Sequence, residues 1–248
     1  MSQTPLISVI IPCYNGAAYL AEAVASIRRQ DYPAVEIIII DDGSTDDSAA
    51  VAATLDGDDL QYFHQQNLGA PGARNTGLKK ASGGVISFLD ADDVWSDNKL
   101  EVQMSLLNVH PEAGIVVGYS QTMQLTSRDQ GNSVFEHISD PAPLLSLSCA
   151  AIRRSVFDTV GFMDQAQRYC DDWDWFMRVR EQGIVIKIHT DLVHYYRRHE
   201  SNMTNEVEIG NQQTLLMLKK SLDRRRRMKE GRAESLPGLD LPQAGPSK

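Results

Sequence analysis

Two nearly continuous runs of apolar, mostly β-branched residues, 6–11 and 35–40, constrain the fold of this chain more than any other feature. Such runs are typical of strands that are buried on both faces, and these strands occur mainly in parallel sheets covered by helices. Between the two runs, Leu20, Val24 and Ile27 recur at helical spacing. The pattern therefore predicts a strand–helix–strand unit with its two strands parallel.

The alternation of strands and helices continues along the first half of the chain. It predicts further strands at 60–63 and 85–89, and helices at 17–29, 44–55 and 73–80. Ser44 is the expected N-cap of the second helix, because its hydroxyl can accept a hydrogen bond from the first turn. Alternation at this spacing indicates a doubly wound α/β sheet.

The order of elements is less regular after residue 110. It predicts strands at 114–119 and 184–188, and helices at 173–181 and 205–222. No linker-like composition precedes residue 205, so we expect one α/β domain over 1–204 with a mixed second half. A basic helix over 205–230 and a disordered Pro/Gly/Ser-rich tail over 231–248 complete the expected organisation.

Composition and charge narrow the class of ligand. The chain has 248 residues, of which 42% are hydrophobic, which is enough for one sizeable core. Its formal charge is −9, but residues 219–232 hold eight Lys/Arg and two acids, so this segment carries +6 and the remainder −15. An acidic body argues against nucleic acid as a partner. If the body binds a phosphorylated ligand, we expect a metal to mediate the contact.

Cysteines and apolar runs bear on the cellular compartment. Cys13, Cys149 and Cys170 lie far apart without metal-ligand spacing, which indicates a reducing compartment and no disulfide framework. Residues 1–5 do not resemble the start of a signal peptide, and the longest purely apolar run, 37–40, is too short to cross a bilayer. We therefore expect a cytoplasmic protein.

Polar residues follow three of the predicted strands. They form the segments "PCYN" (12–15), "DDGS" (41–44) and "DADD" (90–93). Ligands on such sheets bind beyond the carboxyl ends of the strands. The three segments are therefore expected to face one crevice.

The segment "SFLDADDVW" (87–95) permits more than one chemistry. Asp90 and Asp92 can flank one cation, and oxygen ligation favours Mg²⁺ or Mn²⁺. The same pattern also matches haloacid-dehalogenase-like phosphatases, in which the first aspartate, here Asp90, attacks phosphorus. Such a nucleophile usually follows the first strand of its domain, whereas three predicted strands precede Asp90. A solvated acidic turn is the third interpretation.

Two other segments carry candidate groups. In "CDDWDWFMR", Asp171 and Asp172 stand at a predicted helix start, where a carboxylate gains about 0.3–1 kcal/mol from the helix dipole. Their alternation with Trp173 and Trp175 also predicts a sugar-binding wall beside a general base. The segment "NLGAPGARNTG" fits neither a Rossmann fingerprint nor a P-loop, but its Arg74 can reach a diphosphate or form an ordinary surface ion pair.

Taken together, six segments over roughly residues 5–200 resemble the inverting family 2 glycosyltransferases with the GT-A fold: "SVIIPCYNGAAYLAEAVASI", "IIIIDDGSTDDS", "NLGAPGARNTGL", "ISFLDADDVW", "GFMDQAQRYCDDWDWFMR" and "YYRRHESNMT". The resemblance implies a GT-A type doubly wound mixed sheet with a Rossmann-like amino-terminal half. Residues 1–110 would then bind the nucleotide-sugar, and 111–204 would bind the acceptor and carry the catalytic base.

The resemblance also implies roles for donor-site residues. Pro12 and Tyr14 resemble base contacts, with Tyr14 stacking on the ring, and Asp42 resembles the carboxylate that recognises the base. Asp90 and Ala91 would lie along the ribose.

The remaining implied roles concern the diphosphate and the acceptor. Asp92 would hold the metal that bridges the two phosphates, and Asp172 corresponds to the general base. Asp171 stands where the family usually has Glu, a shorter side chain that is expected to leave Asp172 unaffected. His199 resembles a late residue that reaches the metal or the diphosphate in some members, although His194 is near it in sequence.

The activity implied is inverting transfer of a sugar from a nucleotide-sugar, with a UDP-sugar expected, to an acceptor hydroxyl in bacterial cell-surface polysaccharide or glycolipid synthesis. The acceptor would be a glycan or a lipid-linked sugar. The basic helix would dock on an anionic membrane, or pair with the acidic body of the same chain or of a second copy in a homodimer. The other alternative is an inactive nucleotide-sugar-binding module, against which the joint presence of Asp92 and Asp172 argues.

Overall fold

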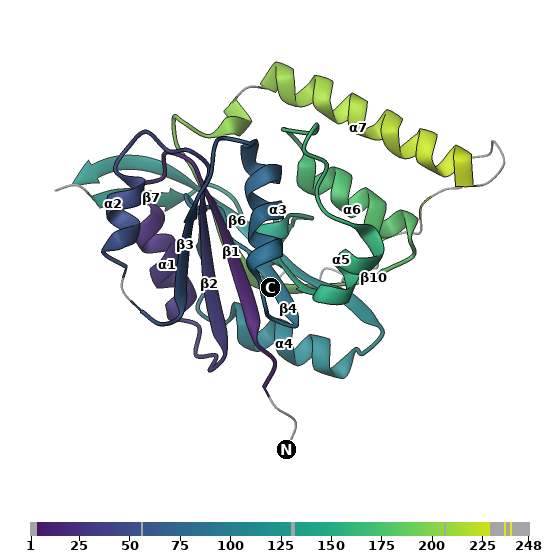
Figure 1. Cartoon of the computed structure of the whole chain (residues 1–248), viewed down its shortest axis with the longest axis horizontal. Helices are drawn as coiled ribbons and strands as arrows, with labels where there is room; N and C mark the ends of the chain where they lie inside the picture. Colours follow the sequence, from purple (N-terminus) through teal and green to yellow (C-terminus); the bar gives the residue numbers. More distant parts are fainter. Residues whose placement is uncertain are drawn as a thin grey trace.

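The computed structural model describes residues 4–55, 57–129, 132–205 and 207–228, together with Leu236 and Leu239. Figure 1 shows a twisted sheet with helices packed against it and one long helix, α7 (Val207–Met228), along the outside next to α6 (Asp171–Glu181). No helix in the described part of the chain is long and apolar enough to cross a membrane.

The amino-terminal half of the sheet is parallel. Its central strand β1 (Ile7–Cys13) pairs with β2 (Val35–Asp41) on one side and β4 (Val85–Phe88) on the other, and β2 also pairs with β3 (Leu60–His64). Three helices connect these strands in turn: α1 (Leu20–Arg28), α2 (Ser48–Ala53) and α3 (Gly69–Lys80). The predicted parallel strand–helix alternation is confirmed.

Antiparallel pairs enter in the second half. β9 (Ala150–Arg153) lies antiparallel between β4 and β6 (Ala113–Asp129), β10 (Val185–Arg198) runs parallel to β6, and β5 (Val94–Trp95) pairs antiparallel with β10. The order is β3-β2-β1-β4-β9-β6-β10-β5. Two short strands, β7 (Asn132–His137) and β8 (Ala142–Pro143), both pair with β6. The sheet is therefore mixed, as expected.

The central strands are buried on both faces. On one face Ile10, Ile38 and Ile40 pack in a cluster with residues of α5 (Arg154–Val160) and α6, whereas Ile11 and Ile39 pack on the other face with α1 and α4 (Lys99–Val109). Successive residues of these strands point to opposite faces of the sheet, and helices cover both faces. The strands are therefore largely apolar and do not alternate apolar with polar residues.

Helices α4 and α5 were not predicted, and α2 begins later than predicted. Helix α4 was not predicted, because its inner face carries the fully buried Lys99 and Gln103, which interrupt the apolar periodicity. The Lys99 ammonium donates to the Gln103 side chain and to the Ala150 carbonyl. The predicted N-cap at Ser44 is wrong: α2 begins at Ser48, and the Ser44 hydroxyl instead accepts from the Asn15 N–H.

The carboxyl-terminal prediction is testable only in part. The predicted helix at 205–222 is present as α7, and a short 3-10 helix, η2 (Met203–Asn205), precedes it. A second 3-10 helix, η1 (Leu147–Cys149), leads into β9. Most of the tail predicted to be disordered, 231–248, lies outside the described residues; of it, Leu239 is partly buried against the larger core cluster.

Candidate active site

A cavity of about 720 Å³ lies at the edge of the sheet where β1, β2 and β4 end. Eight of the predicted site residues line it: Pro12, Tyr14, Asp42, Arg74, Asp90, Ala91, Asp92 and His199. The ninth, Asp172, is not among the lining residues, but its neighbour Asp171 contacts the lining residue Arg74.

Backbone register brings the first two loops together. Cys13 and Asp41 are paired at the ends of β1 and β2, so the segments that follow leave the sheet side by side. The Asn15 carboxamide accepts from the Thr45 N–H, and the Gly16 N–H donates to the Ser48 hydroxyl. These bonds fix the loop that carries Tyr14, whose ring is 55% exposed at the cavity.

Asp42 is buried at the wall of the cavity. Its Oδ1 accepts from the Gln65 side chain at 2.6 Å and from the Leu68 N–H at 2.9 Å. No described group donates to Oδ2, so this oxygen retains its capacity to accept a hydrogen bond. That is the property required of a carboxylate that recognises a nucleobase N–H.

Asp92 and His199 converge although 107 positions separate them. Oδ2 of Asp92 lies 3.0 Å from Nε2 of His199 and accepts from the Asn202 side chain at 3.1 Å. The His199 ring also stacks on Tyr19, with 4.6 Å between the centroids. No group of three or more His, Cys, Asp or Glu side chains suited to a metal occurs among the described residues.

This donor set fits a particular kind of metal site. Mg²⁺ and related ions commonly take one or two protein ligands and complete their coordination with substrate phosphates and water. The Asp92 carboxylate at the cavity wall meets that description, and the His199 imidazole beside it adds a nitrogen that suits a transition metal. They do not meet the requirement of a structural metal centre, which is enclosed by protein ligands.

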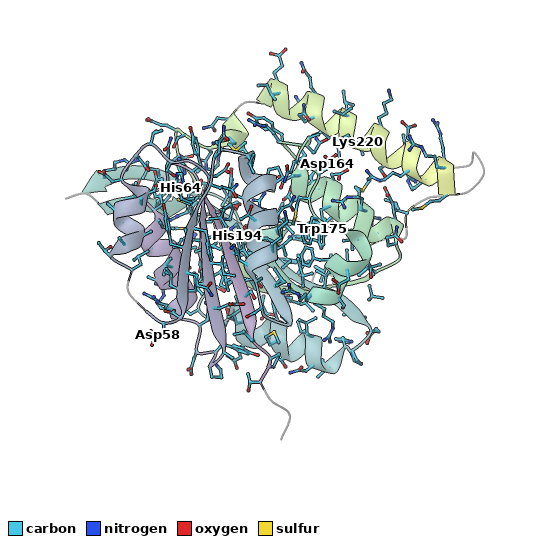
Figure 2. The ribbon with its side chains drawn as sticks, in the orientation of Figure 1. Asp58, His64, Asp164, Trp175, His194 and Lys220 are labelled. Carbon is cyan, nitrogen blue, oxygen red and sulfur yellow. The ribbon has the colours of Figure 1, made fainter. Side chains whose placement is uncertain are left out.

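His194 has a different partner. Its Nε2 lies 2.9 Å from Oδ2 of Asp93, and both side chains are buried (His194 is labelled in Figure 2). Burial would lower the pKa of His194, but the charge of Asp93 outweighs it and raises the pKa to about 10. Oδ1 of Asp93 accepts from the Arg197 N–H. Asp93 therefore ties its loop to β10, and of the two histidines only His199 contacts Asp92.

Arg74 joins two carboxylates across the cavity wall. Its guanidinium donates to Oδ1 of Asp90 at 2.6 Å and to Oδ2 of Asp171 at 2.7 Å. The arginine and Asp171 are both buried. The alternative of an ordinary surface ion pair is therefore wrong, and both terminal nitrogens of Arg74 are already engaged.

Asp172, in the first turn of α6, differs from Asp171 in having no cationic partner within hydrogen-bonding distance among the described residues. Loss of hydration on burial, followed by the negative charge of Asp171, raises the pKa of Asp172 to about 7, with Arg74 opposing the change. The charge of Asp171 thus contributes to the raised pKa of its neighbour.

The predicted aromatic wall is half wrong. Trp173 is 45% exposed, but Trp175 is fully buried, stacks on Phe157 and lies within the core (Figure 2). Residues two apart on a helix point about 200° apart, so they cannot share one surface.

Several lining residues escaped the sequence analysis. Asn67, Arg168, Tyr169 and Asn202 line the cavity, and each comes from a loop whose position depends on distant contacts. Asn202 had one available signal, since it follows His199 by three residues. Arg168 had none, because a single arginine before an acidic helix start is unremarkable.

Comparisons with known proteins identify the family to which the chain belongs. The model of the glycosyl transferase family 2 matches residues 8–161. The chain is 34% identical over 215 residues to the uncharacterized glycosyltransferase RT0329 of Rickettsia typhi, covering 82% of this chain and 67% of that protein. It is 28% identical to the glycosyltransferase GlyG of Streptococcus pneumoniae, over 83% of this chain and 75% of that protein.

Solved structures show the same fold. Residues 1–349 of TarS from S. aureus in complex with UDP-GlcNAc superpose with a TM-score of 0.69 at 20% identity, covering 87% of this chain and 66% of that one. The mannosyltransferase PcManGT of Pyrobaculum calidifontis in complex with GDP-Man and Mn²⁺ superposes with a TM-score of 0.65 at 19% identity. The superposition covers 94% of this chain and 67% of that one.

The match does not extend over the whole of every relative. The chain spans 67%, 61% and 33% of the lengths of the first three curated relatives that it matches. The family model nevertheless covers more than half of this chain. The chain therefore belongs to glycosyltransferase family 2 and has the GT-A fold.

Proposed function

We propose that this glycosyltransferase inverts the anomeric carbon and transfers the sugar from a UDP-sugar to an acceptor hydroxyl, with Asp172 as general base. One observation carries the proposal: within the acidic pair at the start of α6, Asp171 is neutralised by Arg74, whereas Asp172 has no cationic partner within hydrogen-bonding distance among the described residues and has a pKa of about 7. A base is most effective when its pKa is close to the working pH.

The donor would occupy the cavity described above. In this proposal Tyr14 stacks on the base beside Pro12, Asp42 accepts from a base N–H through Oδ2, and Asp90 and Ala91 lie along the ribose. The UDP-GlcNAc bound in TarS and the GDP-Man bound in PcManGT support a nucleotide-sugar as donor. The first 110 residues, which carry these groups, would form the donor-binding half.

Asp92 and His199 would hold a divalent cation, Mn²⁺ or Mg²⁺. The fit of their donor atoms and the Mn²⁺ bound in PcManGT support this. When bound there, the cation supplies positive charge to the leaving diphosphate. Asn202, which contacts both ligands, and Tyr19, which stacks on His199, would orient them.

The chemical step follows from these positions. Asp172 accepts the proton of the acceptor hydroxyl as that oxygen forms a bond to the anomeric carbon. The bond between the anomeric carbon and the phosphate oxygen breaks on the opposite face, and the nucleoside diphosphate leaves with the electron pair. No covalent enzyme intermediate is needed. The single displacement therefore inverts the configuration of the anomeric carbon.

This mechanism disfavours the phosphatase alternative. A nucleophilic Asp90 would need a free carboxylate, but its Oδ1 is paired with Arg74. Family membership also points away from phosphoryl transfer to an aspartate. An aspartyl-phosphate detected at Asp90 would reverse this choice.

The acceptor is proposed to be a glycan or a lipid-linked sugar at an anionic membrane, which α7 would contact. The outer face of α7 exposes Leu215, Leu216, Leu218 and Leu222 beside Lys219. Part of the basic run instead pairs with the body: Lys220 with Asp164 (Figure 2), and Arg224 with Asp174 and Glu181. Flotation with anionic liposomes at low salt tests the membrane contact, and a concentration-dependent dimer would favour a subunit contact instead.

The central test replaces the base. Asp172→Asn keeps the size of the side chain but cannot accept the proton, so transfer is expected to fall about 10²–10⁴-fold. Donor binding, measured by calorimetry with UDP and Mn²⁺, is expected to remain, because Asp172 does not line the cavity. Unchanged transfer by this variant would contradict the assignment of the base, and a product with retained configuration would contradict inversion.

A further inference from the structure

The charges that line the cavity are unevenly paired. Its wall carries the carboxylates of Asp42, Asp90, Asp92 and Asp93, whereas its arginines are Arg74 and Arg168. Arg74 uses both terminal nitrogens on Asp90 and Asp171. Among the described residues no carboxylate pairs with Arg168. The guanidinium of Arg168 is therefore available to pair with an anionic ligand in this acidic cavity.

Arg168 lies against the first residue of α3. A Cβ placed on Gly69 would be 3.8 Å from both Cγ and Nε of Arg168, so the arginine side chain runs over the bare backbone of that glycine. Gly69 has a φ of +77°, which a residue with a side chain rarely adopts. The side chain of Arg168 therefore lies next to Gly69 and Ala70, and all three residues line the cavity.

The backbone around Arg168 is held on both sides. The buried Gln167 donates to the Tyr169 carbonyl and to the Gln213 carbonyl of α7. The Sγ atom of Cys170 lies 3.4 Å from Oγ1 of Thr214 in α7. The backbone of Cys170 has a φ of 58° and turns the chain into α6. The side chain of Arg168 is exposed even though the backbone on each side of it is fixed, which reduces the entropy lost when it binds a ligand.

We propose that Arg168 binds the phosphate oxygens of the donor's diphosphate and stabilises that group as it leaves. This inference rests on the proposed function, because it needs a nucleoside diphosphate in the cavity. A guanidinium forms paired, charge-assisted hydrogen bonds with phosphate, for which a planar fork of donors is suited. The positive end of α3, at Gly69, adds to the favourable potential at the same place.

The experiment compares Arg168→Gln and Arg168→Lys with the control Lys79→Gln. Lys79 is an exposed residue near the other end of α3, and its replacement removes the same charge about 15 Å along the helix from Gly69. Binding of UDP, UMP and uridine is measured by calorimetry with Mn²⁺ and without acceptor. The lack of acceptor ensures that any phosphate recognised belongs to the nucleotide.

Arg168→Gln is expected to weaken UDP binding about 10- to 100-fold, the effect of losing hydrogen bonds to a charged group. Uridine, which has no phosphate, is expected to bind the variant as it binds the unaltered protein. Arg168→Lys should recover part of the UDP affinity, because it keeps the charge but loses the fork. Lys79→Gln should bind all three ligands normally.

The two proposals fail in different ways. If the unaltered protein binds UDP and Arg168→Gln binds it equally well, the role of Arg168 is overturned while the donor site stands. The role of Arg168 is also overturned if uridine and UDP lose affinity in parallel, because the effect would then be structural. Failure of the unaltered protein to bind any of UDP, GDP and dTDP would overturn the donor site, and with it this inference.

Discussion

Arg74 of α3 donates to Asp171 of α6 at 2.7 Å, although 97 positions separate the two residues. Both side chains are buried, and the same guanidinium also reaches Asp90 at the end of β4. This contact joins the helix after β3 to the helix whose first turn carries the proposed base. It also fixes which member of the acidic pair remains unpaired, because only Asp171 is within reach of Arg74.

The first prediction concerns the stability of this pair. Arg74→Met leaves Asp171 buried without a cation, which is expected to lower the free energy of unfolding by about 3–5 kcal/mol. Adding Asp171→Leu to Arg74→Met should recover a large part of the loss, since no charge then remains buried in the pair. Urea unfolding at neutral pH measures both effects.

The exposed pair of Arg29 and Asp97 serves as the matched control. Arg29→Met removes one partner of a solvated ion pair and is expected to cost less than about 1 kcal/mol. An equal cost for Arg74→Met and Arg29→Met would contradict the structural importance of the buried pair.

The second prediction concerns the pH dependence of transfer. The proposed base must be ionised to accept a proton, and burial together with Asp171 raises the pKa of Asp172 to about 7. The value of kcat/KM is therefore expected to rise about tenfold per pH unit below about pH 7 and to level off above it. A profile that is already flat from about pH 5 would show that the essential base has an ordinary carboxylate pKa.

The third prediction is that the same carboxylate reduces stability at high pH. Its pKa is higher in the folded protein than in the unfolded chain, where it is near the ordinary value of 3.8. The unfolded chain thus ionises first, so stability is lost as pH rises from about 4 through 7. Asp172→Asn should raise Tm at about pH 8 and leave it unchanged near pH 4. Each kcal/mol gained in the free energy of unfolding should raise Tm by about 2–4 °C.

The control for this third prediction is Asp97→Asn, which alters an exposed carboxylate. Its effect on Tm is expected to be small at both pH values. A fall in Tm for Asp172→Asn at the higher pH would mean that the ionised carboxylate makes favourable contacts in the folded protein and would contradict the raised pKa.

The sequence predicted the features that depend on local pattern. Buried runs such as 35–40 define strands by composition alone, and parallel strands place their carboxyl ends at one edge, so Asp42, Asp90 and Asp92 could be placed together. Helix α4 was missed because Lys99 faces the core, where a cation is rare and where its burial lowers its pKa to about 7.

Other features depend on contacts between distant segments. Trp175 looks like a surface aromatic next to acidic residues, and only the packing of α6 against Phe157 assigns it to the core. Arg168 acquires its place from α7 and from Gly69, neither of which is near it in sequence. The pairing of Asp92 with His199 was implied by the family resemblance and not by spacing.

The last prediction concerns the proposed metal ligands. Asp92→Asn removes the carboxylate at the cavity wall and is expected to abolish the part of UDP affinity that depends on Mn²⁺, while UDP binding without metal persists. The fold is expected to survive, because the Asp92 side chain is 30% exposed and lies on a loop. Asn202→Ala is the graded comparison: its amide donates to Oδ2 of Asp92, so its loss should weaken Mn²⁺ binding about 10- to 100-fold without abolishing it. Calorimetric titration of UDP with Mn²⁺ or with chelator separates the two variants. If Mn²⁺ raised the UDP affinity of Asp92→Asn as much as that of the unaltered protein, the cation would be held by other residues.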